Sequence, residues 1–477
     1  MVKTLLINPP ILEDTVHSAY YFLPYGLAVL KSFLQKHNRA VTLRDLNMEL
    51  KQTNNAQDIK LLGNLKQFHT EQLSEGNYSG LNNAIGEKLI KRLIDFINIK
   101  NFDVIGIGII SVEQAVGALL IAHTIKHYFN KTVVIGGPYV TLFGKLFFAQ
   151  YSFLDYAILG SGVKSLQHLL QHIEGARLVE NIPSLLFRKN DQVVFNDRKV
   201  FEMEDQLIPD YDGLNLESYG VYGKRSNEYM RYMVSCGCSN NCSFCMCDSV
   251  DGRRQVKSVH KAIKDLLALK EKYKIKAIDF TDANFNKSLD YLQDLCDALI
   301  TEKVGLMWRA RMEPKLMSVD LLVKMKQAGC RVLSWGIESG SEQLRRRMGK
   351  TASLVQAAAA LKASKQQGIK NVALLISEFP YETVHDIKNT EAFLRDNRCN
   401  IDAVFIYPLS IWHGSRMFNT CKSFKIKLLP KPRTYLSFEY SYKELAVKRF
   451  VNLRSFIRRN QQKRLNNMIS TYFPEHG

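Results

Sequence analysis

The chain has 477 residues, of which 46% are hydrophobic and 23% are charged, a composition typical of a globular protein with two or three domains. A chain of this length can bury a full core, so it does not depend on the disulfide framework of a small secreted protein. Its 65 Lys and Arg residues outnumber its 46 Asp and Glu residues, giving a net charge of +19. This charge suits a nucleic acid, a phosphorylated substrate, a carrier protein or a membrane surface, or it simply marks a basic cytosolic protein.

Residues 1–177 alternate short apolar runs with helical patterns, as expected of an α/β domain. Strands are predicted at residues 3–10, 40–47, 104–110, 132–140 and 156–162, and helices at residues 25–37, 87–100 and 115–129. Because successive strand–helix units cross over with a right hand, the strands form a parallel sheet covered by helices on both faces. We therefore expect a Rossmann-like first domain that binds its ligand at the carboxyl ends of its strands.

Residues 178–225 are predicted to form a linker with a small hairpin. A second alternating series follows over residues 226–420, with strands predicted at 230–236, 277–282, 306–312, 331–338, 371–379 and 403–410. Six strand–helix units fit a partial (β/α)6 barrel of the TIM type, with its active site at the carboxyl ends of the strands. Residues 421–477 are predicted to be a basic, largely helical C-terminal extension, whose charges we interpret as the solvated face of a terminal helix.

Five of the nine cysteines lie between Cys236 and Cys247, and none precedes Cys236. Cys238, Cys242 and Cys245 occupy one short loop after the first strand of the second series, so their thiolates can converge on three corners of one [4Fe-4S] cube. Such a cluster keeps one iron open for a substrate ligand.

Zinc is the alternative occupant of this loop. Structural zinc sites usually combine two cysteine pairs, or cysteine with histidine, and the next cysteine after Cys247 is Cys296. We interpret Cys236 and Cys247 as spare thiols; the alternative is an extra ligand or a thiol that quenches a radical.

The chain carries no predicted targeting or membrane segment. The start MVKTLLINPP is too short for a signal peptide. The nearly uncharged stretch 104–122 contains Glu113 and several glycines, so it is predicted to be a strand, a loop and the start of a helix. With the bunched cysteines, these features predict a cytoplasmic protein.

The spacing Cys-x3-Cys-x2-Cys, with Phe244 before the last cysteine, resembles the signature of radical S-adenosylmethionine (SAM) enzymes. Further segments resemble this family in the same order: residues 281–285 (TDANF), 308–312 (WRARM), 336–350 (GIESGSEQLRRRMGK), 379–383 (FPYET) and 413–418 (HGSRMF). Glu378 and Tyr381 stand where the family usually has glycines. The resemblance implies a [4Fe-4S] cluster on Cys238, Cys242 and Cys245, and a 5′-deoxyadenosyl radical made from SAM.

The resemblance also implies which residues bind SAM: Asp282 after the second barrel strand, Arg309 and Arg311 on the third, and Glu338 and Ser339 after the fourth. Asp282 would face the amino end of SAM, and the two arginines its carboxylate. Glu338 and Ser339 would lie near the ribose and the methionine. As alternatives, Glu338 could cap the following helix, and one arginine could be a solvated surface charge.

The first domain resembles the cobalamin-binding module that precedes the barrel in one branch of radical SAM enzymes. The matching pieces are residues 7–10 (INPP), 24–30 (PYGLAVL), 105–111 (IGIGIIS), 135–141 (IGGPYVT) and 155–162 (DYAILGSG), with Asp45. The resemblance implies cobalamin contacts at Pro10, Gly26, Ser111, Gly136, Gly137, Gly160 and Gly162. Glycines after a strand let a large flat ligand approach the backbone.

Two features of the first domain depart from known cobalamin sites. Ser161 and Val163 replace two acidic residues that the family usually has, and no Asp-x-His-x-x-Gly motif offers a histidine to cobalt. A Rossmann-like domain that has lost its cofactor therefore remains the alternative.

The leading hypothesis is a cobalamin-dependent radical SAM methyltransferase that acts on an unactivated carbon. Its substrate would be a small molecule or a peptide, with an anionic group as one option, and its electron donor a protein such as flavodoxin or ferredoxin. The alternatives are a cobalamin-associated radical SAM cyclase or rearrangement enzyme without methyl transfer and, in another class, an iron–sulfur redox sensor or a nucleic-acid-binding protein. A methylthiotransferase is disfavoured because no cysteine precedes Cys236, and we expect no nucleic-acid partner.

Overall fold

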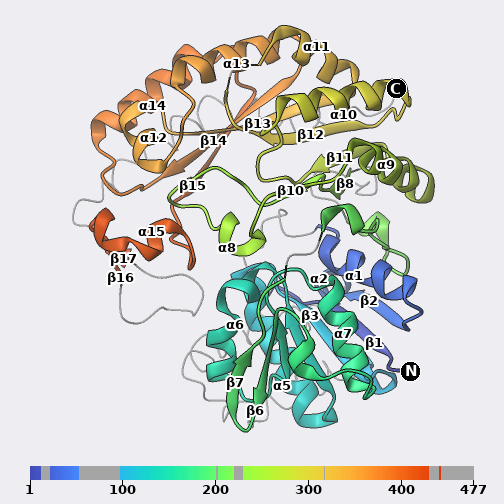
Figure 1. Ribbon diagram of the computed structural model, residues 1–477. Helices are drawn as coiled ribbons and strands as arrows, with labels where there is room; N and C mark the ends of the chain where they lie inside the picture. The colour runs from blue at the N-terminus through green and yellow to red at the C-terminus, as the bar shows by residue number, and fades with distance from the viewer. Residues whose placement is uncertain are drawn as a thin grey trace. The chain divides into compact units, whose positions relative to one another are not determined.

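A computed structural model describes residues 1–11, 22–52, 97–199, 202–219, 229–315, 317–428 and 440–441. Most of the helix predicted at residues 87–100, and most of the predicted C-terminal extension, lie outside the described residues. The chain divides into two compact units (Figure 1): unit 1 contains Met1–Ser226 with Ser249–Gly252, and unit 2 contains Asn227–Asp248 with Arg253–Lys431.

Unit 1 is built on one sheet, whose described strands have the order β2-β1-β3-β4-β5-β6-β7. The first five are parallel: β1 (Thr4–Asn8), β2 (Val41–Asp45), β3 (Val104–Gly108), β4 (Thr132–Gly136) and β5 (Tyr156–Ile158). The connecting helices are α1 (Tyr25–Lys36), α2 (Leu46–Gln52), α5 (Val112–Phe129), α6 (Pro138–Gln150) and α7 (Val163–Ile173). The apolar runs become strands because side chains on both faces of a parallel sheet are buried, as all five residues of β1 and of β3 are.

The hairpin predicted after residue 177 forms and extends the sheet of unit 1. β6 (Leu185–Lys189) pairs antiparallel with β5, and β7 (Gln192–Phe195) pairs antiparallel with β6. Leu185, Leu186 and Phe187 are buried. This packing makes the hairpin part of unit 1, so that the sheet continues past residue 177, where the first domain was predicted to end.

Unit 2 is built on a sheet of parallel strands in the order β15-β14-β13-β12-β11-β8. The strands are β8 (Tyr229–Tyr232), β11 (Ala277–Phe280), β12 (Met307–Met312), β13 (Cys330–Glu338), β14 (Lys370–Ser377) and β15 (Ala403–Pro408). The helices are α9 (Val259–Tyr273), α10 (Leu289–Thr301), α11 (Val319–Gln327), α12 (Glu342–Met348), α13 (Leu354–Gln366), α14 (Val384–Asp396) and α15 (Arg416–Asn419). The prediction of a Rossmann-like domain followed by a partial (β/α)6 barrel is confirmed.

Serine and threonine side chains fix where the barrel helices begin. Ser258, Ser288, Ser318 and Ser353 each accept a hydrogen bond from a backbone N–H in the first turn of the following helix. Such caps satisfy donors that the helix itself leaves free. These caps therefore define the residue at which each of the four helices begins.

The strand register assigns the barrel side chains to two faces. Tyr232, Phe280 and Ala310 are adjacent partners on one face, where the Tyr232 hydroxyl donates to Asp265 of α9. This is the helix-covered face. Arg231, Asp279 and Arg309 are adjacent partners on the opposite face, and Arg311, two residues beyond Arg309 on the same strand, shares that face.

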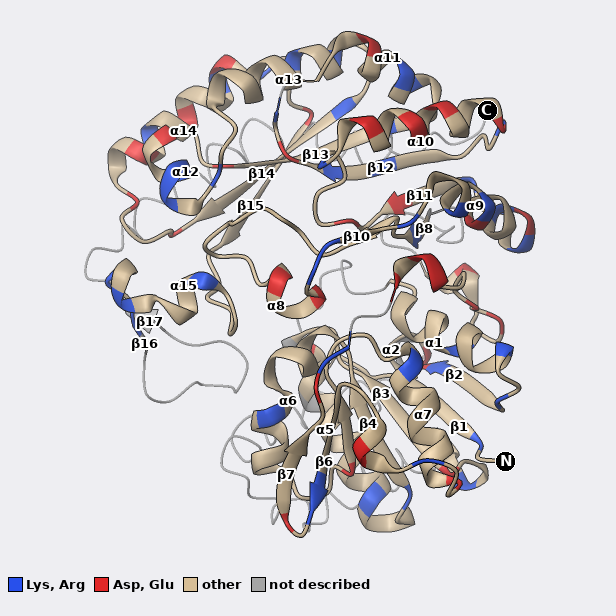
Figure 2. Cartoon of the chain, viewed as in Figure 1, with Lys and Arg blue, Asp and Glu red and all other residues tan. Residues whose placement is uncertain are grey.

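The surface helices of unit 2 carry charges of both signs. Each of α9, α11, α12 and α14 contains Lys or Arg together with Asp or Glu (Figure 2), as is usual for helices with one solvated face. Within the described part of the chain, no helix combines the length and the apolar character needed to cross a lipid bilayer.

Candidate functional site

The cysteine loop is closed at its base by a two-stranded ribbon. β9 (Ser235–Cys236) pairs antiparallel with β10 (Gln255–Val256), and the residues between them include Cys238, Cys242, Cys245 and the short helix α8 (Cys247–Asp251). The ribbon follows β8 directly. The structure thus brings the three predicted cluster ligands together at the carboxyl end of the first barrel strand.

The three thiols have different environments. Cys238 and Cys242 are partly buried and Cys245 is exposed, and all three are free of disulfides. Burial raises the pKa of the Cys238 thiol, and it raises the pKa of Cys242 to about 11, with the nearby Cys245 and Cys238 thiols adding to the rise. Hydrogen bonding from Cys247 lowers the pKa of Cys245 to about 7, and the Cys247 N–H lies 3.5 Å from the Cys245 Sγ.

This donor set fits an iron–sulfur cube. Among the described residues, no three His, Cys, Asp or Glu side chains are grouped closely enough to hold a single metal ion. A [4Fe-4S] cluster places its cysteine ligands around a larger body, and the protein ligands are usually thiolates. Three cysteines in one loop match that requirement, and bound irons would offset the repulsion among the three thiolates.

The middle of the loop is fixed to later parts of the barrel. The Ser243 N–H donates to the carbonyl oxygen of Met348 (2.8 Å), and the Ser243 carbonyl accepts from the Met417 N–H (2.7 Å). Phe244 packs against the apolar cluster that contains Met348 and Met417. Gly349 has a φ of +85°, and a Cβ atom there would lie 2.4 Å from the Asn241 carbonyl oxygen. The loop therefore rests on the C-terminal end of α12.

An ion pair lies beside the cysteines. The Lys350 Nζ is 3.2 Å from the Glu338 Oε1, and both side chains are largely buried. Lys350 lowers the pKa of Cys242 and Glu338 raises it, so both groups are close to that thiol. Glu338 has a φ of +64°, in the left-handed region that a non-glycine residue rarely adopts. Lys350 was not singled out from the sequence, although it ends the segment 336–350 quoted for the resemblance.

A second acidic group reaches the loop from the end of β12. Glu313 accepts hydrogen bonds from Asn240 Nδ2 (3.2 Å), inside the cysteine loop, and from Thr351 Oγ1 (3.1 Å). The Asn240 N–H lies 3.5 Å from the Cys238 Sγ. Sequence reasoning missed Glu313; the available signal was an acidic residue immediately after the third barrel strand.

Asp282 has a different environment from the one predicted. Its side chain is fully buried, and its carboxylate accepts from the Ser235 N–H (2.5 Å), the Ser235 hydroxyl (2.6 Å) and the Val234 N–H (3.4 Å). Burial raises the pKa of Asp282 to about 6. The carboxylate is thus directed at the ribbon, where its oxygens already accept hydrogen bonds, and its contact with the amino end of SAM stays a prediction.

The other predicted SAM residues divide into two groups. Arg309 pairs with Asp279 at 2.8 Å, and Arg311 is exposed on the same face. The Ser339 hydroxyl is buried; it accepts from the Ser341 N–H at 3.1 Å and lies 3.4 Å from Thr390 Oγ1. Ser339 therefore joins α12 to α14, whereas the arginines remain candidates for an anionic group.

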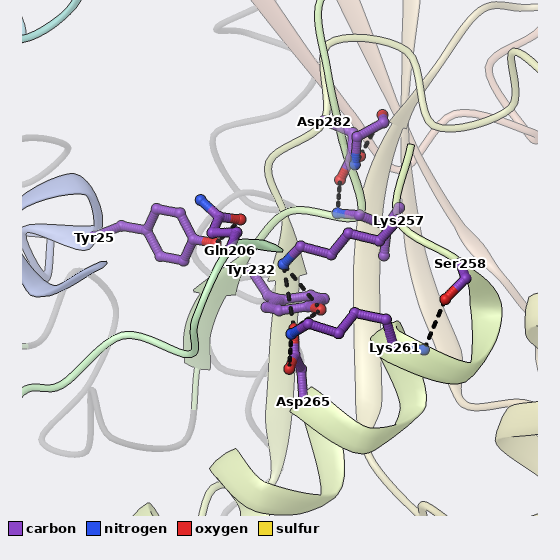
Figure 3. Close-up of polar contacts among 10 residues, drawn as sticks. Tyr25, Gln206, Tyr232, Lys257, Ser258, Lys261, Asp265 and Asp282 are labelled. Carbon is purple, nitrogen blue, oxygen red and sulfur yellow. Dashed lines mark hydrogen bonds and ion pairs between the residues drawn. The ribbon is translucent and has the colours of Figure 1, made fainter. Parts of the chain in front are cut away.

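A buried lysine lies beneath the ribbon, on the helix-covered face (Figure 3). The Lys257 side chain is 0% exposed and its Nζ is 3.1 Å from the Tyr232 hydroxyl and 3.3 Å from the Asp265 carboxylate. Lys261 also donates to Asp265. Burial lowers the pKa of Lys257 to about 8.

This pKa predicts a pH dependence of stability. The folded chain holds fewer protons than the unfolded chain between pH 8 and pH 10.5, so its stability should rise with pH across that window. Relative to a Lys257→Met variant, the wild-type free energy of unfolding should increase by about 3 kcal/mol. Urea unfolding of both proteins at several pH values measures the difference; a difference that does not change with pH contradicts the prediction.

In unit 1, glycines occupy the carboxyl ends of β4 and β5. A Cβ on Gly136 would meet only the Ile158 carbonyl, at 3.8 Å, and Gly26 at the start of α1 has no neighbour within 4 Å. Gly137 has a φ of +108°, and a Cβ there would lie 2.5 Å from the Ile109 carbonyl oxygen. Gly26 and Gly136 therefore present backbone that no side chain covers at the carboxyl ends of the strands, where a large flat ligand can approach.

The other residues predicted to contact cobalamin have other parts of the chain close to them. The carbonyl of Pro10 packs on Gly117, and Gly160 lies under the guanidinium of Arg198. Gly162 faces Leu30 and precedes α7, whereas Ser111 precedes α5. The described histidines of unit 1 lie on α5 and α7 or at the end of α1, so none is on the loops at the carboxyl edge. Among the described residues, this edge therefore offers glycine backbone to a ligand, and no histidine lies on its loops.

A buried polar network holds the same edge of the sheet. The Asp45 carboxylate at the end of β2 accepts from Asn8 Nδ2 (2.9 Å) and the Tyr219 hydroxyl (2.8 Å), and Gln114 donates to Asn8 (2.9 Å). Burial raises the pKa of Asp45. The network joins β1, β2, α5 and the segment before unit 2, and so fixes the loops where a ligand would bind.

Residues 232–394 match the family model of the radical SAM superfamily. Unit 2 is a radical SAM domain. A relative named an uncharacterized methyltransferase, from Pyrococcus horikoshii, is 27% identical over 72% of this chain and 74% of its own length. The prediction of a radical SAM enzyme, similar to methyltransferases, is therefore confirmed.

Two solved structures share the fold of both units. The radical SAM methyltransferase TsrM from Kitasatospora setae, solved with cobalamin and a [4Fe-4S] cluster, is 18% identical with a TM-score of 0.67, over 87% of this chain and 77% of that chain. The cobalamin-dependent radical SAM enzyme OxsB, solved with aqua-cobalamin and SAM, is 15% identical with a TM-score of 0.70, over 93% of this chain and 65% of that longer chain. At these identities the likeness shows the fold, a Rossmann-like unit followed by a radical SAM barrel.

Proposed function

We propose that the chain is a cobalamin-dependent radical SAM methyltransferase that methylates an unactivated carbon. The observation that carries the proposal is the placement of three thiols, in one loop, at the carboxyl end of the first strand of a radical SAM barrel. The glycine-lined edge of unit 1 and the order of the two units, which TsrM and OxsB share, support the cobalamin part.

In this proposal Cys238, Cys242 and Cys245 hold three irons and leave the fourth for SAM. The cluster, when bound, supplies the electron that breaks a C–S bond of SAM. The ion pair of Glu338 and Lys350 lies beside Cys242 and offers a carboxylate and an ammonium to the polar end of SAM. Glu313, which contacts the same loop, offers a second carboxylate.

For cobalamin, the backbone at Gly136 and Gly137 would receive the ring, with Gly26, Gly160, Gly162, Ser111 and Pro10 on the neighbouring loops. The corrin, when bound, supplies the methyl group. What this chain contributes is an open glycine edge, held in place by the Asp45 network, and no histidine for cobalt among the described edge residues.

The row of Arg231, Arg309 and Arg311 supports a substrate with a carboxylate or phosphate group. Three guanidiniums share one face of the barrel sheet with one carboxylate, that of Asp279, and all three lower its pKa. Arginine binds planar anions with two parallel hydrogen bonds. An external flavodoxin or ferredoxin as the electron donor, and the cytoplasm as the compartment, complete the proposal.

The test uses the full chain, reconstituted with iron and sulfide without oxygen, and supplied with SAM, a reductant and hydroxocobalamin. We expect 5′-deoxyadenosine, S-adenosylhomocysteine formed only when cobalamin is present, and a corrin spectrum that stays with the protein through gel filtration. Absence of 5′-deoxyadenosine overturns the radical SAM assignment to this chain. Deoxyadenosine with no labelled methyl leaving SAM favours the second candidate, a radical SAM cyclase or rearrangement enzyme.

Gly137→Ala should weaken cobalamin retention by at least about tenfold. Its φ of +108° and ψ of 174° lie in a region essentially confined to glycine, where a Cβ costs about 1–3 kcal/mol, and the overlap with the Ile109 carbonyl should move the loop that receives the ring. Equilibrium dialysis with hydroxocobalamin measures the change. Gly175→Ala is the control, since Gly175 in unit 1 also has a positive φ, +79°, but no neighbour within 4 Å. A folded Gly137→Ala protein with wild-type affinity contradicts the glycine-edge site.

A further inference from the structure

The base of the cysteine loop is held by five residues, which we call the loop clamp: Tyr232, Ser235, Lys257, Asp265 and Asp282. Figure 3 labels four of the five, Tyr232, Lys257, Asp265 and Asp282. On one side, Asp282 from the end of β11 accepts hydrogen bonds from β9. On the other side, Lys257 follows β10 and extends its side chain under the sheet to Tyr232 and Asp265. Each strand of the ribbon is therefore anchored by its own charged group.

The two halves meet at Val234. Its N–H points to the Asp282 carboxylate at 3.4 Å, and its carbonyl oxygen accepts the Lys257 N–H at 2.8 Å. The Asp282 charge also raises the pKa of Lys257, so the carboxylate and the ammonium act on each other through the base of the loop. A displacement of either group would move the backbone that leads into Cys236 and Cys238.

Charged groups are a costly way to fill this space. A buried ion pair is often no more stabilising than apolar side chains of the same volume, and both Lys257 and Asp282 are fully buried. What charged hydrogen bonds do supply is direction, because a donor and an acceptor fix distance and angle whereas apolar contacts slide. The ribbon has only two residues in each strand, so its own ladder gives little resistance to sliding.

We infer that the loop clamp is a positioning device that sets the orientation of the cysteine loop on the barrel, and with it the geometry of the iron corner that receives SAM. Asp282 is thereby a positioning residue that acts through Ser235, with no contact of its own to SAM. The inference rests on the proposed function, because it presupposes that Cys238, Cys242 and Cys245 hold the cluster.

Asp282→Asn tests the inference with almost no change in volume. An amide has one acceptor oxygen, so the Asn NH2 group must face one of the donors on Val234 or Ser235. We expect the variant to assemble a cluster, to bind SAM at least about tenfold more weakly, and to show a changed electron paramagnetic resonance (EPR) spectrum of the reduced cluster when SAM is added. Asp402→Asn is the matched control. Like Asp282, Asp402 accepts a backbone N–H, from Asn371 at 2.8 Å; in addition it accepts a hydrogen bond from the Lys365 ammonium.

The outcomes separate the inference from the function on which it rests. If wild-type protein shows no SAM-dependent EPR change, the proposed function fails first. If wild-type and Asp402→Asn show the change, and Asp282→Asn shows the same spectra and the same SAM affinity as the wild type, the clamp is overturned. Circular dichroism and thermal unfolding establish that each variant is folded.

Ser235→Ala covers the case in which Asp282→Asn does not fold. It removes one hydrogen bond to the carboxylate and keeps the two backbone donors, so we expect an intermediate weakening of SAM binding, about two- to fivefold. In the Asp282→Asn background, where that bond is already disturbed, the same change should have a smaller effect. Wild-type EPR spectra and SAM affinity in folded Ser235→Ala protein overturn the inference.

Discussion

Alanine at Cys238, Cys242 or Cys245, one at a time, should abolish the visible absorbance of the [4Fe-4S] cluster and reduce SAM cleavage to the level of a reaction without enzyme. Each substitution leaves two thiolates for a cube that needs three, and a second iron corner becomes exposed. Iron and sulfide analysis, with chromatography of 5′-deoxyadenosine, measures both effects in anaerobically reconstituted protein.

Cys399→Ser is the control for these substitutions, because Cys399 is exposed and lies outside the loop. Its iron content and SAM cleavage should equal those of the wild type. Cys247→Ala should also keep the cluster, because Cys247 lies outside the Cys-x3-Cys-x2-Cys spacing. Full iron content in any of the three single alanine variants would remove that cysteine from the ligand set.

Gly349→Ala should have the next largest effect, a loss of most of the cluster from a chain that still folds. The substitution forces a side chain into the left-handed region, at a cost of about 1–2 kcal/mol, and its Cβ would overlap the carbonyl oxygen of Asn241, in the cysteine loop. A shift of the Asn241 carbonyl relieves the overlap, so we expect the cysteine loop to move. Iron content and thermal unfolding of the same preparation measure the two consequences.

Gly368→Ala distinguishes this clash from backbone strain alone. Gly368, near the end of α13, has a φ of +68°, and a Cβ there would meet only the flexible Lys326 side chain, at 3.6 Å. The control should lose stability and keep its iron. Equal iron content in the two variants would mean that contact with α12 does not shape the loop.

The fold could be predicted because its strands are short apolar runs separated by helical patterns. Each of the six barrel strands forms within a run predicted from the sequence, apart from one or two residues at the ends. The antiparallel pairing of β6 with β5 could not be predicted in this way. A hairpin looks the same in sequence whether it stands alone or extends a sheet, since the pairing partner lies elsewhere in the chain.

The candidate site was only partly predictable. The cysteine spacing is local, so it could be read directly. Lys257 is surrounded in sequence by Arg, Gln, Ser and His, which indicates an exposed segment, and its burial depends on Tyr232 and Asp265 from elsewhere in the barrel. Asp282 was assigned to SAM through the family resemblance, but the hydrogen bonds that orient it come from Ser235, 47 residues earlier.

Glu378 and Tyr381 occupy backbone positions that favour glycine. Both stand where the family usually has glycines, and both have a positive φ, +62° and +71°. Part of the strain at Tyr381 is offset, because its hydroxyl donates to the Ser423 carbonyl at 3.2 Å and Arg347 lies over its ring at 4.6 Å. At Tyr381 these side-chain contacts therefore hold a backbone conformation that favours glycine.

The attachment of Ser243 to Met348 and Met417 has a consequence for how the metalloprotein matures. More than 100 residues of chain must be synthesised after the cysteines before the partners of Ser243 at the end of α12 exist, and the Met417 N–H follows later still. A nascent chain that ends before this point has its thiols but not the support that orients them. Iron delivery is therefore expected to follow synthesis of the chain through Met417, and a carrier of preassembled clusters would then meet a receptor loop that is already shaped.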